Sequence, residues 1–519
     1  MLILYFILII LLSAFTFWRS FHLALFGDDW LAFWRYLQHL GPKSSGEWNH
    51  LTYFLTPYGA QDIMMGVLQK IIGYSSTWYY VSSYILRLLA AFSLYPLVYY
   101  LTRSKLSAFF AVLFFSVTIT GFDTTNWSSN MTSYITIALF NLFLYFFIKE
   151  RDDNKPISLI ISAILYYFAY ITTPIRMHGS IPLIFLLELF WVLQKRDSKT
   201  IKKAILRLLL IIAVFIFIKF TGQSLGPSNE PAERLVLGLK TSLELISQGK
   251  IAFLSYPVII LGSILIPDFI LPSIGRNPIL FLTGVCILAT VFFLIIKFFK
   301  RTNISTVLFL GLTWSLLSFF FAWWRDPTII FPTISRYLIV SVQGISIMLA
   351  TLISISKEKG RQISIFTFLC IILIVHIIAT RIYTNYLLNS HGQENSNKIW
   401  SSIPYVPEIG KKKEPIIFYF EGDPGTENII HDTITFGFPP HMALLYNLRE
   451  GDADLPVAVS NWQDIVSAVT TGNTLKAWGY KTDSLPAENV YAFYLKDKDN
   501  LVNITDIARN KLKEISNNK

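Results

Sequence analysis

Residues 1–18 read MLILYFILIILLSAFTFW, and the sequence Phe26-Gly27-Asp28-Asp29-Trp30 follows after a short interval. An apolar run of about 20 residues is long enough to cross the hydrocarbon core of a bilayer as a helix. The first stretch therefore predicts a membrane-spanning helix, and it places two adjacent carboxylates just beyond the end of that helix.

Apolar runs of similar length recur along most of the chain. The sequence is 53% hydrophobic and 15% charged, with a mean hydropathy of +0.50, whereas an average soluble domain has about 25% charged residues. A single soluble core is thereby excluded. The net charge of +11 comes from Lys and Arg in short loops between apolar runs, as the positive-inside rule predicts, so nucleic acid is not an expected partner. Cys286 and Cys370 lie inside apolar runs and indicate neither a disulfide framework nor a metal site.

The alternation of basic and neutral loops predicts about eleven spans, with the N-terminus in the cytoplasm. We expect the membrane to be a bacterial plasma membrane. Residues 2–18 lack a basic leader region, so the first span is expected to remain uncleaved. Segment 252–272 contains three prolines and Asp268 and is predicted to be re-entrant or interfacial within an outer loop at 221–276. The other runs are expected at about 1–18, 77–101, 106–121, 277–297, 304–322, 337–356 and 362–382, with four more between 127 and 221.

Hydropathy divides the chain into two domains. Residues 1–382 are predicted to form a mainly α, polytopic transmembrane helix bundle. In residues 383–519 hydropathy falls, and the runs 415–420 and 490–495 are typical of strands, while 504–516 is typical of a helix. We therefore expect a small α/β domain at the C-terminus, on the extracytoplasmic side.

The first outer loop, residues 19–76, contains the aspartate pair. Apolar residues recur at helical spacing from Trp30 to Leu40, which predicts an interfacial helix. One aspartate before such a helix is a good N-cap. A second carboxylate beside it adds repulsion, which raises the pKa of one partner and suits a general base. Adjacent helical side chains diverge by about 100°, so Asp28 and Asp29 are expected to have different roles, and the catalytic and capping interpretations both stay open.

Two arginines lie at the outer ends of apolar runs, where positive charge is scarce. Arg176 and Arg336 could extend to lipid headgroups, or each could bind a phosphate, which the guanidinium matches in geometry and charge. Arg325 could join them, although an ion pair with Asp326 is the simpler account. His178 is interpreted as a supporting residue or a boundary residue.

Asp62 could complete a carboxylate cluster with Asp28 and Asp29 around a divalent cation, Mg²⁺ or Mn²⁺. Nothing in the spacing requires a metal, so no cofactor is firmly predicted. The sequence contains no Walker loop, HExxH, GxSxG or paired CxxC motif. Nucleotide hydrolysis and the common hydrolase mechanisms therefore lack support.

Taken in order, these motifs resemble those of the GT-C superfamily of polytopic glycosyltransferases, which includes the protein O-mannosyltransferases and bacterial enzymes that use polyprenyl-phosphate sugars. The resemblance covers roughly residues 1–380. It is carried by Asp28-Asp29-Trp30 in the first outer loop, Tyr58 to Gly73 running into Trp78-Tyr79-Tyr80-Val81, Asn126-Trp127, Arg176, and Ser335-Arg336-Tyr337-Leu338. It departs from the family where Met177-His178 replaces an acidic residue, and residues 383–519 match nothing assignable.

The resemblance implies a sugar transfer from a lipid-linked donor to a glycan, lipid or protein acceptor on the outer face of the membrane. Asp28 is implied as the general base and Asp29 as its partner. Arg176, Arg336 and Tyr337 are implied as ligands of the donor phosphate. Two other interpretations stay open: a transporter or flippase for lipid-linked glycans, and a membrane scaffold that presents residues 383–519 to a partner.

Overall fold

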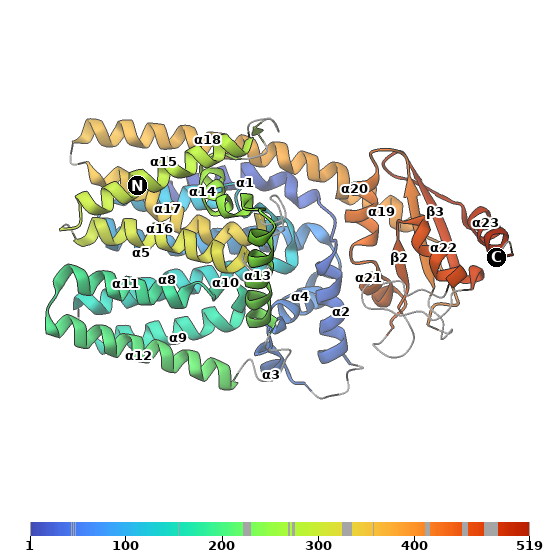
Figure 1. The fold of residues 1–519 in the computed structure, drawn as a ribbon, viewed down its shortest axis with the longest axis horizontal. Helices are drawn as coiled ribbons and strands as arrows, with labels where there is room; N and C mark the ends of the chain where they lie inside the picture. Colours follow the sequence, from blue (N-terminus) through green and yellow to red (C-terminus); the bar gives the residue numbers. More distant parts are fainter. Residues whose placement is uncertain are drawn as a thin grey trace.

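Long apolar helices lie side by side in one bundle, and a smaller α/β domain is attached at one end of it (Figure 1). The structure is a computed structural model. It describes residues 2–517 except 43, 45, 47, 154, 222–229, 268–269, 272–275, 301, 324–334, 357, 411–415, 449–454 and 472–485. The predicted fold class, a mainly α transmembrane bundle with a small C-terminal α/β domain, is confirmed.

Each predicted span coincides with a helix. These helices are α1 (Leu2–Phe17), α5 (Ser76–Thr102), α6 (Lys105–Val117), α8 (Thr132–Asp153), α9 (Pro156–Thr172), α11 (Ser180–Lys195), α12 (Ser198–Thr221), α15 (Arg276–Lys297), α16 (Thr302–Trp323), α17 (Ser335–Ile355) and α18 (Lys359–His391). Within the described residues, 8 helices are long and apolar enough to cross a membrane, or up to 9 if a bent pair counts as one span. Helices α6 and α9 are apolar but shorter, and α12 begins with several lysines. The chain is an integral membrane protein, and the number of crossings stays a prediction.

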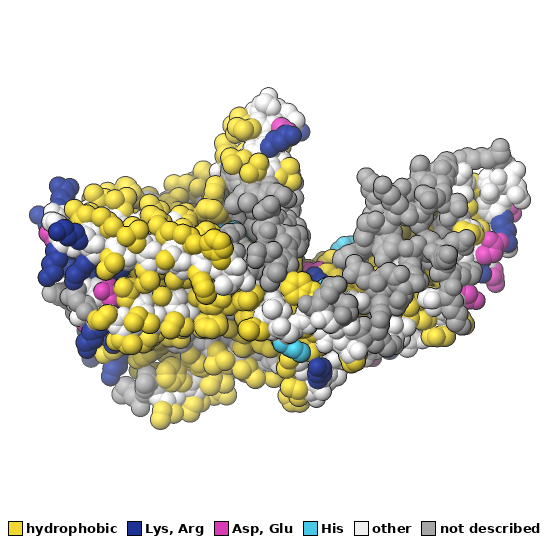
Figure 2. Space-filling view, turned by 90° about the horizontal axis from the view of Figure 1, so that it is seen from below, with side chains coloured by type: hydrophobic (Ala, Val, Ile, Leu, Met, Phe, Trp, Pro, Cys, Tyr) yellow, Lys and Arg dark blue, Asp and Glu magenta, His cyan; other side chains and the backbone are white. Residues whose placement is uncertain are grey.

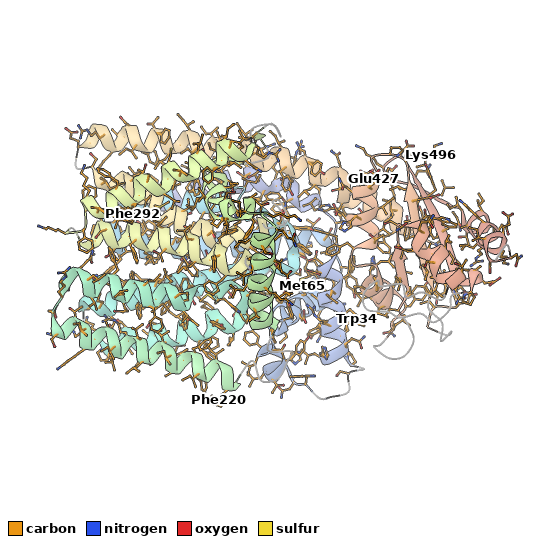
Figure 3. The ribbon with its side chains drawn as sticks, viewed as in Figure 1. Trp34, Met65, Phe220, Phe292, Glu427 and Lys496 are labelled. Carbon is orange, nitrogen blue, oxygen red and sulfur yellow. The ribbon has the colours of Figure 1, made fainter. Side chains whose placement is uncertain are left out.

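The outer flank of the bundle is apolar, and its two ends differ in charge. Hydrophobic side chains cover the visible flank in Figure 2, whereas Lys and Arg gather at the end remote from the α/β domain. Phe292 of α15, labelled in Figure 3, is 62% exposed. Such exposure is unfavourable in water and is expected where lipid covers the surface.

Small residues allow close approach between neighbouring helices. A Cβ on Gly311 of α16 would lie 2.7 Å from the carbonyl oxygen of Gly344 in α17, and one on Gly284 of α15 would lie 1.9 Å from the carbonyl oxygen of Val258. Glycines at such crossings are typical of membrane helix packing, where van der Waals contact replaces the hydrophobic effect.

The segment predicted to be re-entrant or interfacial, residues 252–272, is separated from the preceding helix by a sharp bend. Helix α13 (Glu230–Ser247) is followed by the 3-10 turn η3 (Ala252–Ser255) and by α14 (Tyr256–Leu265). The chain bends by 120° between the end of α13 and the start of η3. This geometry fits either a broken span or a re-entrant loop. Pro257 stands in the first turn of α14, where a missing N–H is harmless.

The first loop forms three helices against the bundle: α2 (Asp28–Leu40), α3 (His50–Phe54) and α4 (Gly59–Ile72). The helix predicted at Trp30–Leu40 is confirmed. Helices α2 and α4 share a small core, in which Met65 (labelled in Figure 3) packs beside residues of the loop and of the bundle. That core consists of Leu25, Ala32, Phe33, Met65, Tyr79 and Met131.

The C-terminal domain is built on a four-stranded sheet of order β2-β1-β3-β4. Strands β1 (Ile417–Gly422), β2 (Val457–Val459) and β3 (Val490–Lys496) are parallel, and β4 (Asn500–Asn503) pairs antiparallel with β3. The sheet has an apolar core on each face, and the domain's helices are α19 (Gln393–Ser402), α20 (Glu427–Ile429), the π-helix η5 (Ile430–Thr435), α21 (Phe438–Leu445), α22 (Trp462–Thr471) and α23 (Thr505–Asn517), with the 3-10 turn η6 (Ala487–Asn489). Both predicted strands and the predicted final helix are confirmed.

Candidate active site

Gly27 fixes the start of α2 and joins it to the C-terminal domain. Its φ of +56° is a conformation that other residues rarely adopt. Its N–H donates to the carbonyl oxygen of Phe436 over 3.1 Å, and a Cβ at this position would lie 2.0 Å from the Phe436 ring. Only glycine fits this approach. The two aspartates that follow stand in the first turn of α2, where the helix dipole favours negative charge.

Asp29 is fully buried and ties the first loop to the bundle. Its Oδ1 accepts from the N–H of Ser129 at 2.7 Å, and its Oδ2 accepts from the N–H of Phe26 at 3.3 Å. Burial raises the pKa of Asp29 to about 7, although these two N–H donors oppose the shift. Asp28 is half-buried. The adjacent carboxylates therefore occupy different environments, and of the two only Asp28 reaches the surface.

Asp62 forms a bidentate ion pair with Arg35. The Nε and Nη2 of Arg35 donate to the two carboxylate oxygens at 2.9 and 2.8 Å, and the Tyr53 hydroxyl donates to Oδ2 at 2.7 Å. Burial lowers the pKa of Arg35, but Asp62 and, more weakly, Asp28 raise it, so that the net shift is upward. Arg35 follows Asp28 by seven residues and therefore shares its helix face. Asp62 therefore positions the Arg35 guanidinium close to Asp28.

A metal ion bound by Asp62 would have to compete with the Arg35 guanidinium. Among the residues that the structure describes, no group of three or more His, Cys, Asp and Glu side chains is placed to hold a metal ion. The predicted option of a cation shared by Asp28, Asp29 and Asp62 stays a prediction.

Arg176 lies at the same end of the bundle as the aspartates. It belongs to the short helix α10 (Pro174–Met177) and is buried. Its Nε donates to the Oγ of Ser133 over 3.2 Å. Ser129, the donor to Asp29, lies in the 3-10 turn η2 (Ser128–Met131), and Ser133 follows as the second residue of α8. A single short segment therefore connects the buried carboxylate with the buried guanidinium.

Tyr337 lies against Arg176, whose guanidinium carbon is 4.5 Å from the centre of the tyrosine ring. This contact places the first turn of α17 beside Arg176 and so brings together two of the three residues predicted to hold the donor phosphate. Arg336 precedes Tyr337, but its side chain lies outside the described residues, as does Arg325. The ring of His178 stacks on Tyr170, and its Nδ1 donates to the carbonyl oxygen of Pro174 at 2.5 Å.

The C-terminal domain contributes residues that sequence analysis did not find. The Phe26 ring lies 4.5 Å from the ring of His391. Trp30 stacks on His441 at 3.8 Å, and Trp400 covers the same histidine at 3.9 Å (centre-to-centre distances). Burial lowers the pKa of His441 to about 3, so the imidazole is neutral between these rings. The signal available in the sequence was the apolar run Gly437-Phe438-Pro439-Pro440 that precedes His441, and it points to no partner.

Backbone contacts also join the C-terminal domain to the first loop. The N–H of Ala24 donates to the carbonyl oxygen of His391 over 2.9 Å, and Leu23 and Gly392 form an antiparallel bridge. Helices α2 and α21 are in contact, and Trp34, labelled in Figure 3, lies on α2 where it faces this domain. The aspartate pair is thus positioned from two sides, by the bundle and by the C-terminal domain.

Comparison with known proteins gives only distant likenesses. No known protein-family model and no curated protein matches the chain. The solved structures that it resembles include the oligosaccharyltransferase AglB from Archaeoglobus fulgidus in complex with an inhibitory peptide and a dolichol-phosphate, with 13% identity, a TM-score of 0.48, and coverage of 94% of this chain and 69% of that one. The apo form of the Archaeoglobus fulgidus oligosaccharyltransferase gives 12% identity, a TM-score of 0.47, and coverage of 90% and 67%. TM-scores below 0.5 mark a loose correspondence of chain paths.

Proposed function

We propose that the chain is an integral-membrane glycosyltransferase that moves a sugar from a polyprenyl-phosphate donor to an acceptor hydroxyl. The observation that carries the proposal is the short segment that joins the acid to the cation. The Asp29 carboxylate accepts from the N–H of Ser129, and the Arg176 guanidinium donates to Ser133, four residues further along the chain. Asp28, beside Asp29, is the carboxylate with access to the surface. The GT-C resemblance of the motifs supplies the reaction class.

In the proposed reaction Asp28 accepts the proton of the acceptor hydroxyl as the hydroxyl oxygen attacks the anomeric carbon of the sugar. The bond between that carbon and the donor phosphate oxygen breaks, and the phosphate leaves with its negative charge. Arg176 stabilises this charge, and Tyr337 fixes the plane of the guanidinium by lying against it. Attack opposite to the leaving group inverts the configuration at the anomeric carbon.

The proposed reaction takes place on the extracytoplasmic face. Lys and Arg gather at the end of the bundle remote from the C-terminal domain (Figure 2), and the positive-inside rule assigns such an end to the cytoplasm. The aspartate pair, at the opposite end, then faces outward together with the C-terminal domain. The proposed partners are the lipid-linked donor, a glycan, lipid or protein acceptor, and the surrounding membrane lipids.

The test is sugar transfer by purified protein from polyprenyl-phosphate donors, with Asp28 and Asp29 replaced singly by Asn. A general base contributes about 10²- to 10⁴-fold to a rate, so Asp28→Asn is expected to lower kcat by that factor while donor binding is retained. Asp506→Asn, on exposed α23, is the matched control and should transfer sugar at the wild-type rate. Full turnover by both Asp28→Asn and Asp29→Asn would refute the proposal, and passage of lipid-linked glycan without sugar transfer would favour a flippase.

A further inference from the structure

A charged hollow lies at the opposite end of the bundle from the aspartate pair. It has a volume of about 370 Å³ and lies between α8, α11, α12 and the start of α16. Five cationic side chains line it, together with two acidic ones, Asp152 and Asp197. The cations are Arg151, Lys195, Lys199, Lys203 and Arg207. It belongs to the Lys- and Arg-rich end visible in Figure 2.

Ion pairs fix the two arginines of this hollow. The Nε and Nη2 of Arg207 donate to Glu188 at 2.6 and 2.8 Å, and its Nη1 contacts Glu150 at 3.3 Å. Arg151 pairs with Asp152 at 2.9 Å. These arginines form a rigid floor for the hollow, and their charges are largely balanced by the acids.

The second acid of the lining is also engaged. Asp197 accepts from the N–H and the hydroxyl of Thr200 at 2.7 and 2.6 Å and so caps the start of α12. Lys195 and Lys199 make no ion pair with a described residue, and Lys203 follows Lys199 by four residues on α12. Like charges at this spacing repel each other. Counting the described side chains, the five cations of the lining face four acids, Asp152, Asp197, Glu150 and Glu188, and an anion would neutralise the excess positive charge.

An apolar stripe continues from the lysines along α12. Leu206 follows Lys199 by seven residues and is 60% exposed, and the half-exposed Leu210 follows Lys203 by seven. Residues seven apart lie on the same helix face, separated by about 10 Å along the axis. A charged group beside the lysines would thus have an apolar surface directly beneath it, as a lipid headgroup and its acyl chain require and a free phosphate does not.

We propose that this hollow binds the phosphate of an anionic membrane lipid, with one acyl chain along the Leu206 face of α12. The juxtaposition of a fixed arginine floor, an excess of lysine charge and an adjoining apolar stripe is what recognises such a lipid. This site is separate from the proposed catalytic end, and its test does not depend on sugar transfer.

The experiment measures lipid retention by delipidated full-length protein in detergent, using native mass spectrometry. The probes are phosphatidylglycerol and phosphatidylcholine, and inorganic phosphate is the soluble competitor. The variant is Lys195→Gln/Lys199→Gln. The matched control is Lys297→Gln/Lys359→Gln, because these two exposed lysines lie at helix ends outside the hollow.

We expect wild type and control to bind one phosphatidylglycerol saturably, and the Lys195/Lys199 variant to bind it about 30-fold more weakly, which corresponds to about 1 kcal/mol for each lysine. Phosphatidylcholine should bind all three proteins equally. Equal retention of phosphatidylglycerol by variant and wild type would overturn the proposal. Displacement of the lipid by millimolar inorganic phosphate would overturn it as well, because the site would then recognise a free anion.

Discussion

The buried carboxyl group of Asp29 makes the stability of the first loop depend on pH, and Asp29→Asn tests this dependence. In the folded chain the pKa of Asp29 is about 7, against an ordinary 3.8. Below pH 3.8 the carboxyl group is protonated in both the folded and the unfolded chain, so its stabilising contribution to the free energy of unfolding is fully present. Between 3.8 and 7 the unfolded chain loses the proton first, and stability falls as pH rises; above 7 the contribution is lost and no further change follows.

The expected size follows from the linkage relation. Each pH unit between the two pKa values changes the free energy of unfolding by about 1.4 kcal/mol, so wild type should lose about 3 kcal/mol between pH 4.5 and pH 7 through this group alone. Asparagine carries no charge at any pH. Its oxygen still accepts from Ser129, but its amide faces the N–H of Phe26, which costs about 1 kcal/mol.

The assay is the thermal unfolding midpoint in detergent, followed by tryptophan fluorescence from pH 4.5 to 8.5. Wild type should be more stable than Asp29→Asn at pH 4.5 and less stable above pH 7. Asp506→Asn, exposed on α23, is the control: it keeps Asp29, so its stability should still fall relative to that of Asp29→Asn between pH 4.5 and pH 7. If the curves of wild type and Asp29→Asn run parallel, Asp29 does not titrate in this range and the reasoning from its burial is wrong.

Three further outcomes are expected. Arg176→Lys keeps the charge but loses the guanidinium fork, and we expect the KM for the lipid donor to rise about 10- to 100-fold with the KM for the acceptor unchanged; an unaltered donor KM would remove Arg176 from the phosphate site. Asp62→Asn breaks the pair with Arg35, whose side chain is 22% exposed, so hydrogen-exchange protection of α4 should fall by about 2–3 kcal/mol; unchanged protection would show that the pair adds nothing. Gly27→Ala meets both a positive φ and the Phe436 ring, so exchange of α21 should accelerate while that of α16 does not, and equal rates would contradict the fit.

The sequence predicted those parts of the molecule that depend on local periodicity. A hydrophobic pattern within a few residues predicts the membrane helices, the amphipathic helix α2 and the strands β1 and β3. Each of these elements must bury one face or its whole surface, and this requirement sets the pattern. The different environments of Asp28 and Asp29 were likewise expected from the divergence of adjacent helical side chains. Arg176 and Tyr337, two of the residues that the resemblance implies as phosphate ligands, are in contact, and their binding of a phosphate stays a prediction.

The rest of the site depends on contacts between distant residues, which carry no local pattern. The partner of Asp29 is Ser129, and the partner of Asp62 is Arg35. The rings of two histidines of the C-terminal domain, His391 and His441, pack on the aromatic side chains of Phe26 and Trp30 in the loop.

The hydrogen bond between Gly27 and Phe436 joins positions that leave the ribosome about 400 residues apart. During synthesis the first loop therefore waits for its final partner until nearly the whole chain has been made. A chain cut short before residue 436 would still insert its apolar helices, yet its aspartates would stand at the head of an unsupported α2. The newly made protein therefore obtains a supported aspartate pair only after the C-terminal domain has been synthesised and has docked on α2.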